Sequence, residues 1–87
     1  MLARKKPVEV EVMQYKGDNK QELYDWSGGT VHLAYESSDT YILVVNTLEG
    51  TMVVPKDSYV IKGVEGEFYA CDYDIFHKTY ELIEEEL

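Results

Sequence analysis

The sequence has little of what metal sites, disulfides and membrane spans require: one cysteine, two histidines, and no long apolar run. The single Cys71 excludes an internal disulfide, which indicates a reducing compartment. Two histidines and one thiol are too few for the clustered ligands of a zinc site, so we expect no metal and no cofactor. The longest apolar run, at 41–45, is too short to cross a bilayer. We therefore predict a soluble cytoplasmic protein without membrane association.

Basic residues are also scarce. Eight Lys and Arg stand against 17 Asp and Glu, which gives a formal net charge of −9. Three of the bases lie within residues 1–6, so the rest of the chain is more acidic still. Such a chain repels nucleic acid, because affinity for phosphate depends on basic contacts. We expect no direct nucleic-acid binding; the charge serves solubility or, alternatively, recognition of a basic groove on another protein.

Acidic pairs raise the possibility of acid–base catalysis, because glycosidases use two carboxylates. Glu65 and Glu67, like Asp72 and Asp74, are spaced i, i+2. On a strand this spacing places each pair on one face, and we expect that face to be exposed to solvent rather than to line a cleft. We therefore interpret these acids as surface charge.

Nucleophilic and phosphate-binding motifs are weak as well. Cys71 and His77 are close enough in sequence for a thiol and its base, but we interpret Cys71 as a small buried residue that fills a gap. Gly63 and Gly66 lack the following helix and Lys-Ser/Thr pair of a phosphate loop. The sequence therefore predicts a protein that is not an enzyme.

A chain of 87 residues forms one domain and buries roughly 60% of its unfolded surface. We expect a single domain over 1–87, with a basic arm at 1–6 and an acidic tail at 84–87. Its main helix is predicted near 19–26, with a capping box at its start and Gly28-Gly29 at its end.

Period-two patterns and hairpin glycines predict a β-rich remainder. The expected strands are 8–13, 30–35, 40–48, 51–54, 59–62, 67–70 and 79–83. The segment 72–76 is predicted to form one helical turn, and Leu48 and Phe68 are expected in the core. The fold class is α+β, mostly β: a small bent antiparallel sheet or partial barrel with one short covering helix.

Short motifs along the chain resemble a family of small phage and prophage proteins of unassigned function, the PGDYG-type family. The resemblance implies a phage setting, a small β-rich fold and no established enzyme activity. It is carried by Arg4-Lys5-Lys6-Pro7-Val8, Gln14-Tyr15, Gly17-Asp18-Asn19, Thr47-Leu48-Glu49-Gly50, Tyr59-Val60-Ile61-Lys62-Gly63, Gly66-Glu67-Phe68-Tyr69, Cys71, Asp74-Ile75-Phe76 and Thr79-Tyr80-Glu81.

The chain departs from that family at two places. Where the family usually has Pro-Gly-Asp before a tyrosine, this chain has Lys56-Asp57-Ser58, so we expect the turn to be rebuilt without its glycine. Where the family tends to read Tyr-Pro-Cys-Lys-Pro-Asp, residues 69–74 replace a lysine with Asp72 and lose both prolines. The second change adds negative charge.

Eight tyrosines suit an interface, since tyrosine offers a large contact area with a polar tip. Tyr73, between two aspartates, is the best candidate for a contact residue. We predict a non-enzymatic phage protein that inhibits a nucleic-acid-handling or defence protein of the host, of the anti-CRISPR type, in the host cytosol. The predicted partner-binding face, directed at a basic surface of that protein, contains Asp57, Glu65, Glu67, Asp72, Tyr73 and Asp74.

The alternative is a small-molecule binder, a homo-oligomer that sequesters a nucleotide-type immune signal. Arg4, Lys6 and Lys62 would then meet the phosphates at a subunit interface. Tyr15 or Trp26 would stack on the base.

Overall fold

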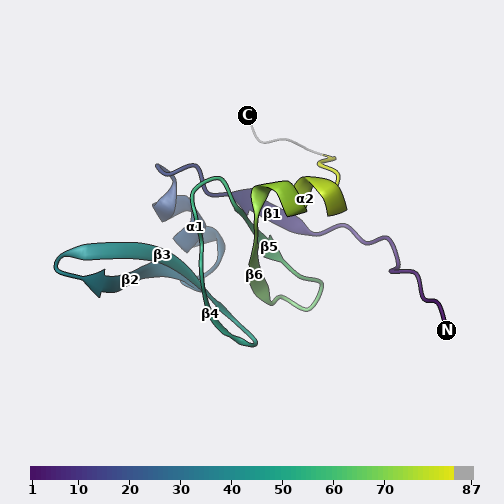
Figure 1. Ribbon diagram of the computed structural model, residues 1–87, viewed down its shortest axis with the longest axis horizontal. Coiled ribbons are helices and arrows are strands. Elements are labelled where there is room, and N and C mark those ends of the chain that lie inside the picture. The colour runs from purple at the N-terminus through teal and green to yellow at the C-terminus, as the bar shows by residue number, and fades with distance from the viewer. Residues whose placement is uncertain (84–87) are drawn as a thin grey trace.

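Six strands and two short helices make up the computed structural model, which describes residues 1–83 (Figure 1). The predicted acidic tail at 84–87 lies outside the described residues. In chain order the elements are β1 (Glu11–Gln14), α1 (Lys20–Trp26), β2 (Val31–Ser37), β3 (Thr40–Thr47), β4 (Gly50–Val53), β5 (Tyr59–Lys62), β6 (Phe68–Cys71) and α2 (Tyr73–Thr79).

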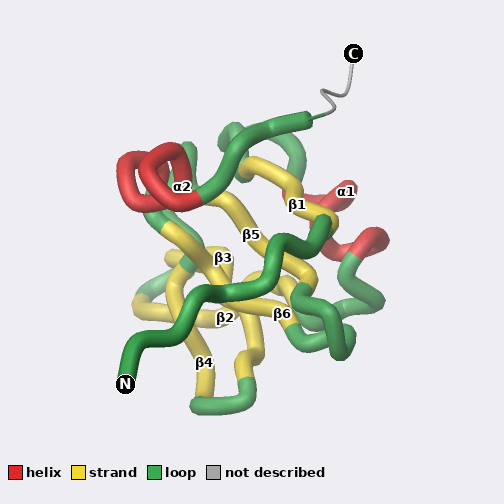
Figure 2. Tube along the Cα trace, turned by 90° about the vertical axis from the view of Figure 1, so that its right-hand side faces the viewer, coloured by secondary structure: helices red, strands yellow, loops and turns green. Residues whose placement is uncertain are grey.

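The strands form two three-stranded antiparallel sheets, with orders β1-β5-β6 and β2-β3-β4. This confirms the predicted α+β fold that is mostly antiparallel β. The sheets meet where β3 and β4 approach β6, and β1 and β5 lie between the two helices (Figure 2). The β2–β3 hairpin extends away from this junction (Figure 1).

The main core lies between α1 and the two sheets. Its six buried residues are each at most 4% exposed: Leu23, Val31, Leu43, Val45, Val54 and Val60. Trp26 and Phe68 pack against this cluster and meet edge to face, with ring centroids 5.3 Å apart. Burying one such aliphatic side chain stabilises the fold by about 1.5–3 kcal/mol as an upper estimate. Phe68 therefore supports the core, as predicted.

The start of α1 differs from the predicted capping box. Asn19 is the N-cap residue, but its side chain makes no capping hydrogen bond. Its Oδ1 instead accepts from the Lys16 N–H at 2.8 Å, and its Nδ2 donates to the Gln14 carbonyl at 2.8 Å. Asn19 is only 9% exposed, so these two bonds satisfy a buried amide and fasten α1 to the end of β1.

The end of α1 is as predicted. The Gly29 N–H donates to the Tyr24 carbonyl at 2.9 Å, and the Gly28 N–H donates to the Asp25 carbonyl at 3.2 Å. Both glycines have positive φ, 65° and 88°, as this helix termination requires. The turn then directs the chain into β2.

A second cluster lies under α2. Tyr59 and Ile61 of β5 bury Phe76, which is 1% exposed. Phe76 stacks on Tyr59 with centroids 3.9 Å apart and on Tyr80 at 5.0 Å. The predicted single turn at 72–76 is therefore a full helix, and the predicted strand at 79–83 is wrong. Phe76 and Tyr80 follow the helical i, i+4 spacing. The prediction missed this spacing because the short run of apolar residues near the C-terminus suggested a strand instead.

Leu48 is not a core residue, contrary to the prediction. It is 86% exposed, because β3 ends at Thr47 and β4 begins at Gly50, so Leu48 and Glu49 form the two-residue turn. The Thr47 hydroxyl donates to the Gly50 carbonyl at 2.6 Å across this turn. The N-terminal alternation is also shorter than predicted: β1 begins at Glu11, and Val8 is exposed.

Candidate functional site

The six residues predicted to bind a partner lie at the two ends of the β5–β6 pair. Tyr59 pairs with Cys71, so Asp57 and the segment 72–74 share one end. Lys62 pairs with Phe68, so Glu65 and Glu67 belong to the opposite end. The two ends of a four-residue strand are about 10 Å apart. The structure therefore divides the predicted acidic face into two sites.

We name the first of these the α2-end surface: Asp57, Asp72, Tyr73 and Asp74. Asp72 is the N-cap residue of α2 and makes no side-chain capping hydrogen bond, and Asp74 lies in the first turn. The i, i+2 pair is thus at a helix start, in the segment predicted to be helical, and not on a strand face. Carboxylates at this end of a helix are stabilised by about 0.3–1 kcal/mol by the aligned peptide dipoles.

Aromatic neighbours support Tyr73. Its ring is 48% exposed and lies 4.4 Å from the His77 ring and 6.3 Å from the Tyr59 ring, between centroids. The Tyr59 hydroxyl and His77 Nε2 are hydrogen-bonded at 3.1 Å, which ties the helix to β5. A ring supported in this way loses less rotational freedom when a partner covers it.

Asp57 is fixed by its backbone. Its N–H donates to the Tyr15 carbonyl at 2.7 Å, and its own carbonyl accepts from Gln14 Nε2 at 3.1 Å. Asp57 has φ of 76°, a left-handed conformation that Asp tolerates better than most residues. Asp57 therefore adopts the positive φ itself at the position where the resembled family has glycine.

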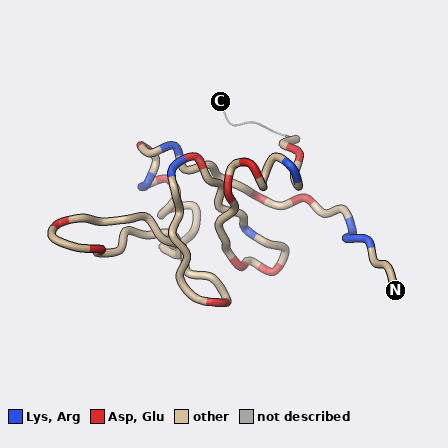
Figure 3. Tube along the Cα trace, viewed as in Figure 1, with Lys and Arg blue, Asp and Glu red and all other residues tan. Residues whose placement is uncertain are grey.

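Within residues 1–83, the carboxylates of the α2-end surface form no ion pair. Among residues 1–83 the ion pair that forms is Lys62–Glu11, at 3.6 Å across β5 and β1. Figure 3 shows acidic residues both at the α2 end and at the hairpin turns, with a basic segment along the N-terminal arm. Charge at the α2 end is thus available to a partner.

Glu67, at the opposite end, lines a surface hollow of about 350 Å³. A Cβ at Gly63 would overlap the Glu67 carboxylate, so this side chain folds back over the turn. Glu65 lies in the same turn and is exposed. The other residues around the hollow are Thr47, Leu48, Glu49, Met52, Phe68, Tyr69 and Ala70.

The residues of the alternative small-molecule site do not come together. Arg4 and Lys6 are exposed on the arm that precedes β1, and Lys62 is paired with Glu11. Tyr15 and Trp26 pack against the main core. No pair of facing aromatic and basic groups is formed from this set.

Cys71 and His77 do not form a catalytic pair. Burial, followed by the charge of Asp72, raises the pKa of the Cys71 thiol, which disfavours the thiolate that a nucleophile requires. His77 is hydrogen-bonded to Tyr59 instead. Burial and the hydrogen bond between the Tyr69 and Tyr80 hydroxyls also raise the pKa of Tyr69 to about 12. Both pKa shifts arise because Cys71 and Tyr69 pack against the aromatic cluster under α2.

Metal-binding groups are lacking within residues 1–83: no three His, Cys, Asp or Glu side chains there are grouped closely enough to hold a metal ion. No helix in this range has the length and apolar character needed to span a bilayer.

Comparison with known proteins found no match. No protein-family model, curated protein or solved structure matches this chain. The resemblance to the phage family therefore stays a prediction.

Sequence reasoning missed the aromatic cluster that supports Tyr73. Its signal was present as the helical spacing of Tyr73, Phe76, His77 and Tyr80. The sequence did not predict that Tyr59 belongs to this cluster, because its position beside α2 depends on the pairing of β5 with β6.

Proposed function

We propose that this protein is a non-enzymatic binding protein that uses the α2-end surface to engage a basic surface of another protein. The observation that carries the proposal is Tyr73, half-exposed on an aromatic support and flanked by unpaired carboxylates from two segments. Tyrosine is enriched among residues that dominate binding energy, and rim charges steer association. Tyr73 therefore supplies binding energy in the complex, and the carboxylates around it speed association.

The target class follows from the charge. A surface of carboxylates competes best for a groove that otherwise holds phosphates. A nucleic-acid-handling or defence protein of a phage host has such a groove, and its inhibition remains the function we propose. The alternative, a nucleotide-sequestering oligomer, would place its site between subunits, and within one chain over residues 1–83 its basic and aromatic residues lie apart.

Matched charge variants test the proposal. Asp57→Asn, Asp72→Asn and Asp74→Asn together remove three charges from the α2-end surface, and asparagine tolerates the positive φ at position 57. The control removes three charges elsewhere: Glu49→Gln, Glu65→Gln and Glu67→Gln. Wild type and the control should capture the same protein from bacterial lysate, and the Asn triple should not.

Capture of the same protein by all three would remove the α2-end surface from the mechanism.

Tyr73→Ala should raise the dissociation rate of the partner that the wild type captures, whereas Tyr73→Phe, which keeps the ring, should have a smaller effect. Equal dissociation rates for wild type and Tyr73→Ala would show that this tyrosine is not an anchor.

A further inference from the structure

The outer edge of β2 is open. β2 is the terminal strand of the sheet β2-β3-β4, and no strand of residues 1–83 pairs with its other side. Edge strands are usually protected by charges, prolines or bulges. Residues 26–35 contain no Asp, Glu, Lys, Arg or Pro, and the bulge lies beyond them, between 35 and 37. This edge therefore lacks the features that prevent pairing.

The register of β2 against β3 decides which backbone groups face outward. The Asn46 N–H donates to the Thr30 carbonyl at 3.1 Å, so Thr30 faces β3. In an antiparallel pair such residues alternate, so His32 and Ala34 face β3 as well. The intervening residues direct their backbone groups away from the sheet: Val31, Leu33 and Tyr35.

Only part of this edge is available. The Val31 N–H already donates to the Ser27 hydroxyl at 2.9 Å. No described residue is hydrogen-bonded to the outward groups of Leu33 and Tyr35. Their side chains are 47% and 65% exposed and share one face of the hairpin. The free segment is thus short, apolar and centred on Ala34.

We propose that a second copy of this chain pairs antiparallel with β2, with the two-fold axis at Ala34. Leu33 of each copy then lies opposite the partner's Tyr35, and each such pair exchanges two backbone hydrogen bonds. This register uses the free groups of Leu33 and Tyr35 and leaves the Val31 N–H with Ser27. A register centred on Leu33 would require the occupied Val31 N–H.

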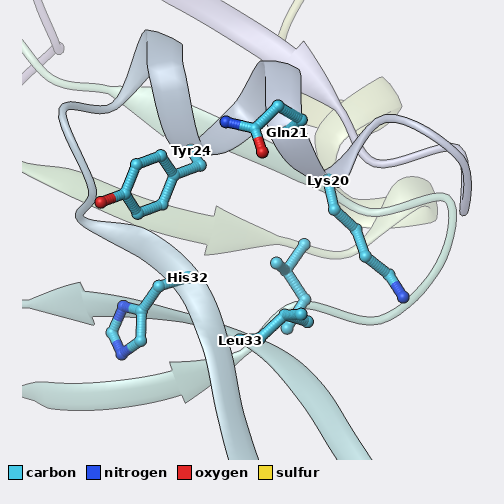
Figure 4. A pocket seen from close by; sticks show the side chains of 6 residues that line it. Lys20, Gln21, Tyr24, His32 and Leu33 are labelled. Atoms are coloured by element: carbon cyan, nitrogen blue, oxygen red, sulfur yellow. The ribbon is translucent and has the colours of Figure 1, made fainter.

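A hollow beside β2 receives the partner's side chain. It has a volume of about 320 Å³, lies between α1 and the β2–β3 hairpin (Figure 4), and is lined by Lys20, Gln21, Tyr24, His32, Leu33 and Leu43. A two-fold axis perpendicular to the sheet keeps equivalent faces on the same side. The partner's Tyr35, opposite Leu33, therefore lies next to the hollow, where its ring meets apolar groups and its hydroxyl meets polar ones.

Local charge does not oppose this register. The uncharged stretch of each β2 meets its counterpart, so no acids oppose one another along the paired residues 33–35. Glu36, at the bulge beside Tyr35, falls close to the partner's His32. The α2-end surface lies on the other side of the molecule (Figure 1), so this inference is independent of the proposed function.

Disulfide trapping tests the register. In an antiparallel pair, two Ala34 residues at the axis have Cα atoms about 4.5 Å apart, within the range that a disulfide spans. Ala34→Cys in a Cys71→Ser background should form a covalent dimer on mild oxidation. Glu49→Cys in the same background, at an exposed turn, is the control and should form far less.

Sedimentation of the reduced protein provides the second measurement. Wild type should reach twice the monomer mass of 10.1 kDa as its concentration rises. Tyr35→Lys should weaken the dimer at least about tenfold. Tyr41→Lys, on the inner strand and 58% exposed, is the control and should weaken it less. A monomer at every concentration, or a dimer that Tyr35→Lys leaves intact and Ala34→Cys does not trap, would overturn the proposal.

Discussion

The α2 end and the β2–β3 hairpin both expose tyrosines, yet their surroundings differ. Tyr73 lies between two aspartates on an aromatic support, whereas Tyr35 and Tyr41 meet edge to face on paired strands whose one charged residue is Glu36 at the bulge. The same side chain therefore suits different contacts. Charge around Tyr73 favours a basic partner, and the open backbone beside Tyr35 favours another strand.

The two regions also differ in how they are held. Tyr73 lies beside the Tyr59 and His77 rings, and α2 is bonded to β5 through the hydrogen bond between the same two residues. The outer hairpin is held mainly by pairing of β2 with β3, since the exposed Tyr35 and Tyr41 lie beyond the core. We expect substitutions to cost much under α2 and little on the hairpin.

The largest effect should come from Phe76→Ala, which removes a ring that is 1% exposed. We expect a loss of about 3–5 kcal/mol in the free energy of unfolding. Tyr41→Ala should cost no more than about 1.5 kcal/mol, the value of one exposed aromatic pair. Leu48→Ala should stay within about 0.5 kcal/mol. Urea unfolding measures all three, and equal losses would remove the contrast between the regions.

Asn19→Ala should have an intermediate effect, because the buried amide links the end of β1 to the start of α1. The Lys16 N–H and the Gln14 carbonyl would lose their partner, at a cost of about 1–3 kcal/mol. Asn46→Ala, on the exposed face of β3, is the matched control and should cost under about 0.5 kcal/mol. If both variants unfold at the same urea concentration, Asn19 is not a structural link.

The pH effect should appear only at alkaline pH and should come from the sheet beneath α2. Burial and the Tyr80 hydrogen bond raise the pKa of Tyr69 from 10 to about 12, so the folded state holds this proton more tightly. Its contribution to stability is complete below about pH 10 and is lost as pH rises to about 12. Tyr69→Phe should flatten this decline in urea unfolding, and a wild-type slope in the variant would contradict the assignment.

Much of the fold was predictable because local patterns decide it. The helix near 19–26, its glycine end and most strands follow from propensity and turn residues. Leu48 was misplaced because the hairpin turn is Leu48-Glu49, one residue earlier than the predicted Glu49-Gly50, with Thr47 bonded across it to Gly50. The strand predicted at 79–83 failed because Phe76 and Tyr80 pack with helical spacing against β5.

The candidate site was only half predictable. Asp72, Tyr73 and Asp74 are neighbours in sequence, so their grouping needed no tertiary information. Glu65 and Glu67 lie at the other end because strand pairing, which a single sequence does not reveal, sets which turns come together. The support of Tyr73 by Tyr59 depends on the same pairing.

The most direct test of the central claim is the association rate of the captured partner with the two matched charge triples, measured at low and physiological salt. The account predicts that Asp57→Asn, Asp72→Asn and Asp74→Asn together slow association about tenfold at low salt and flatten its salt dependence. Glu49→Gln, Glu65→Gln and Glu67→Gln together should change the rate much less. Equal slowing by both triples would show that net charge alone steers binding and would contradict a binding surface at the α2 end.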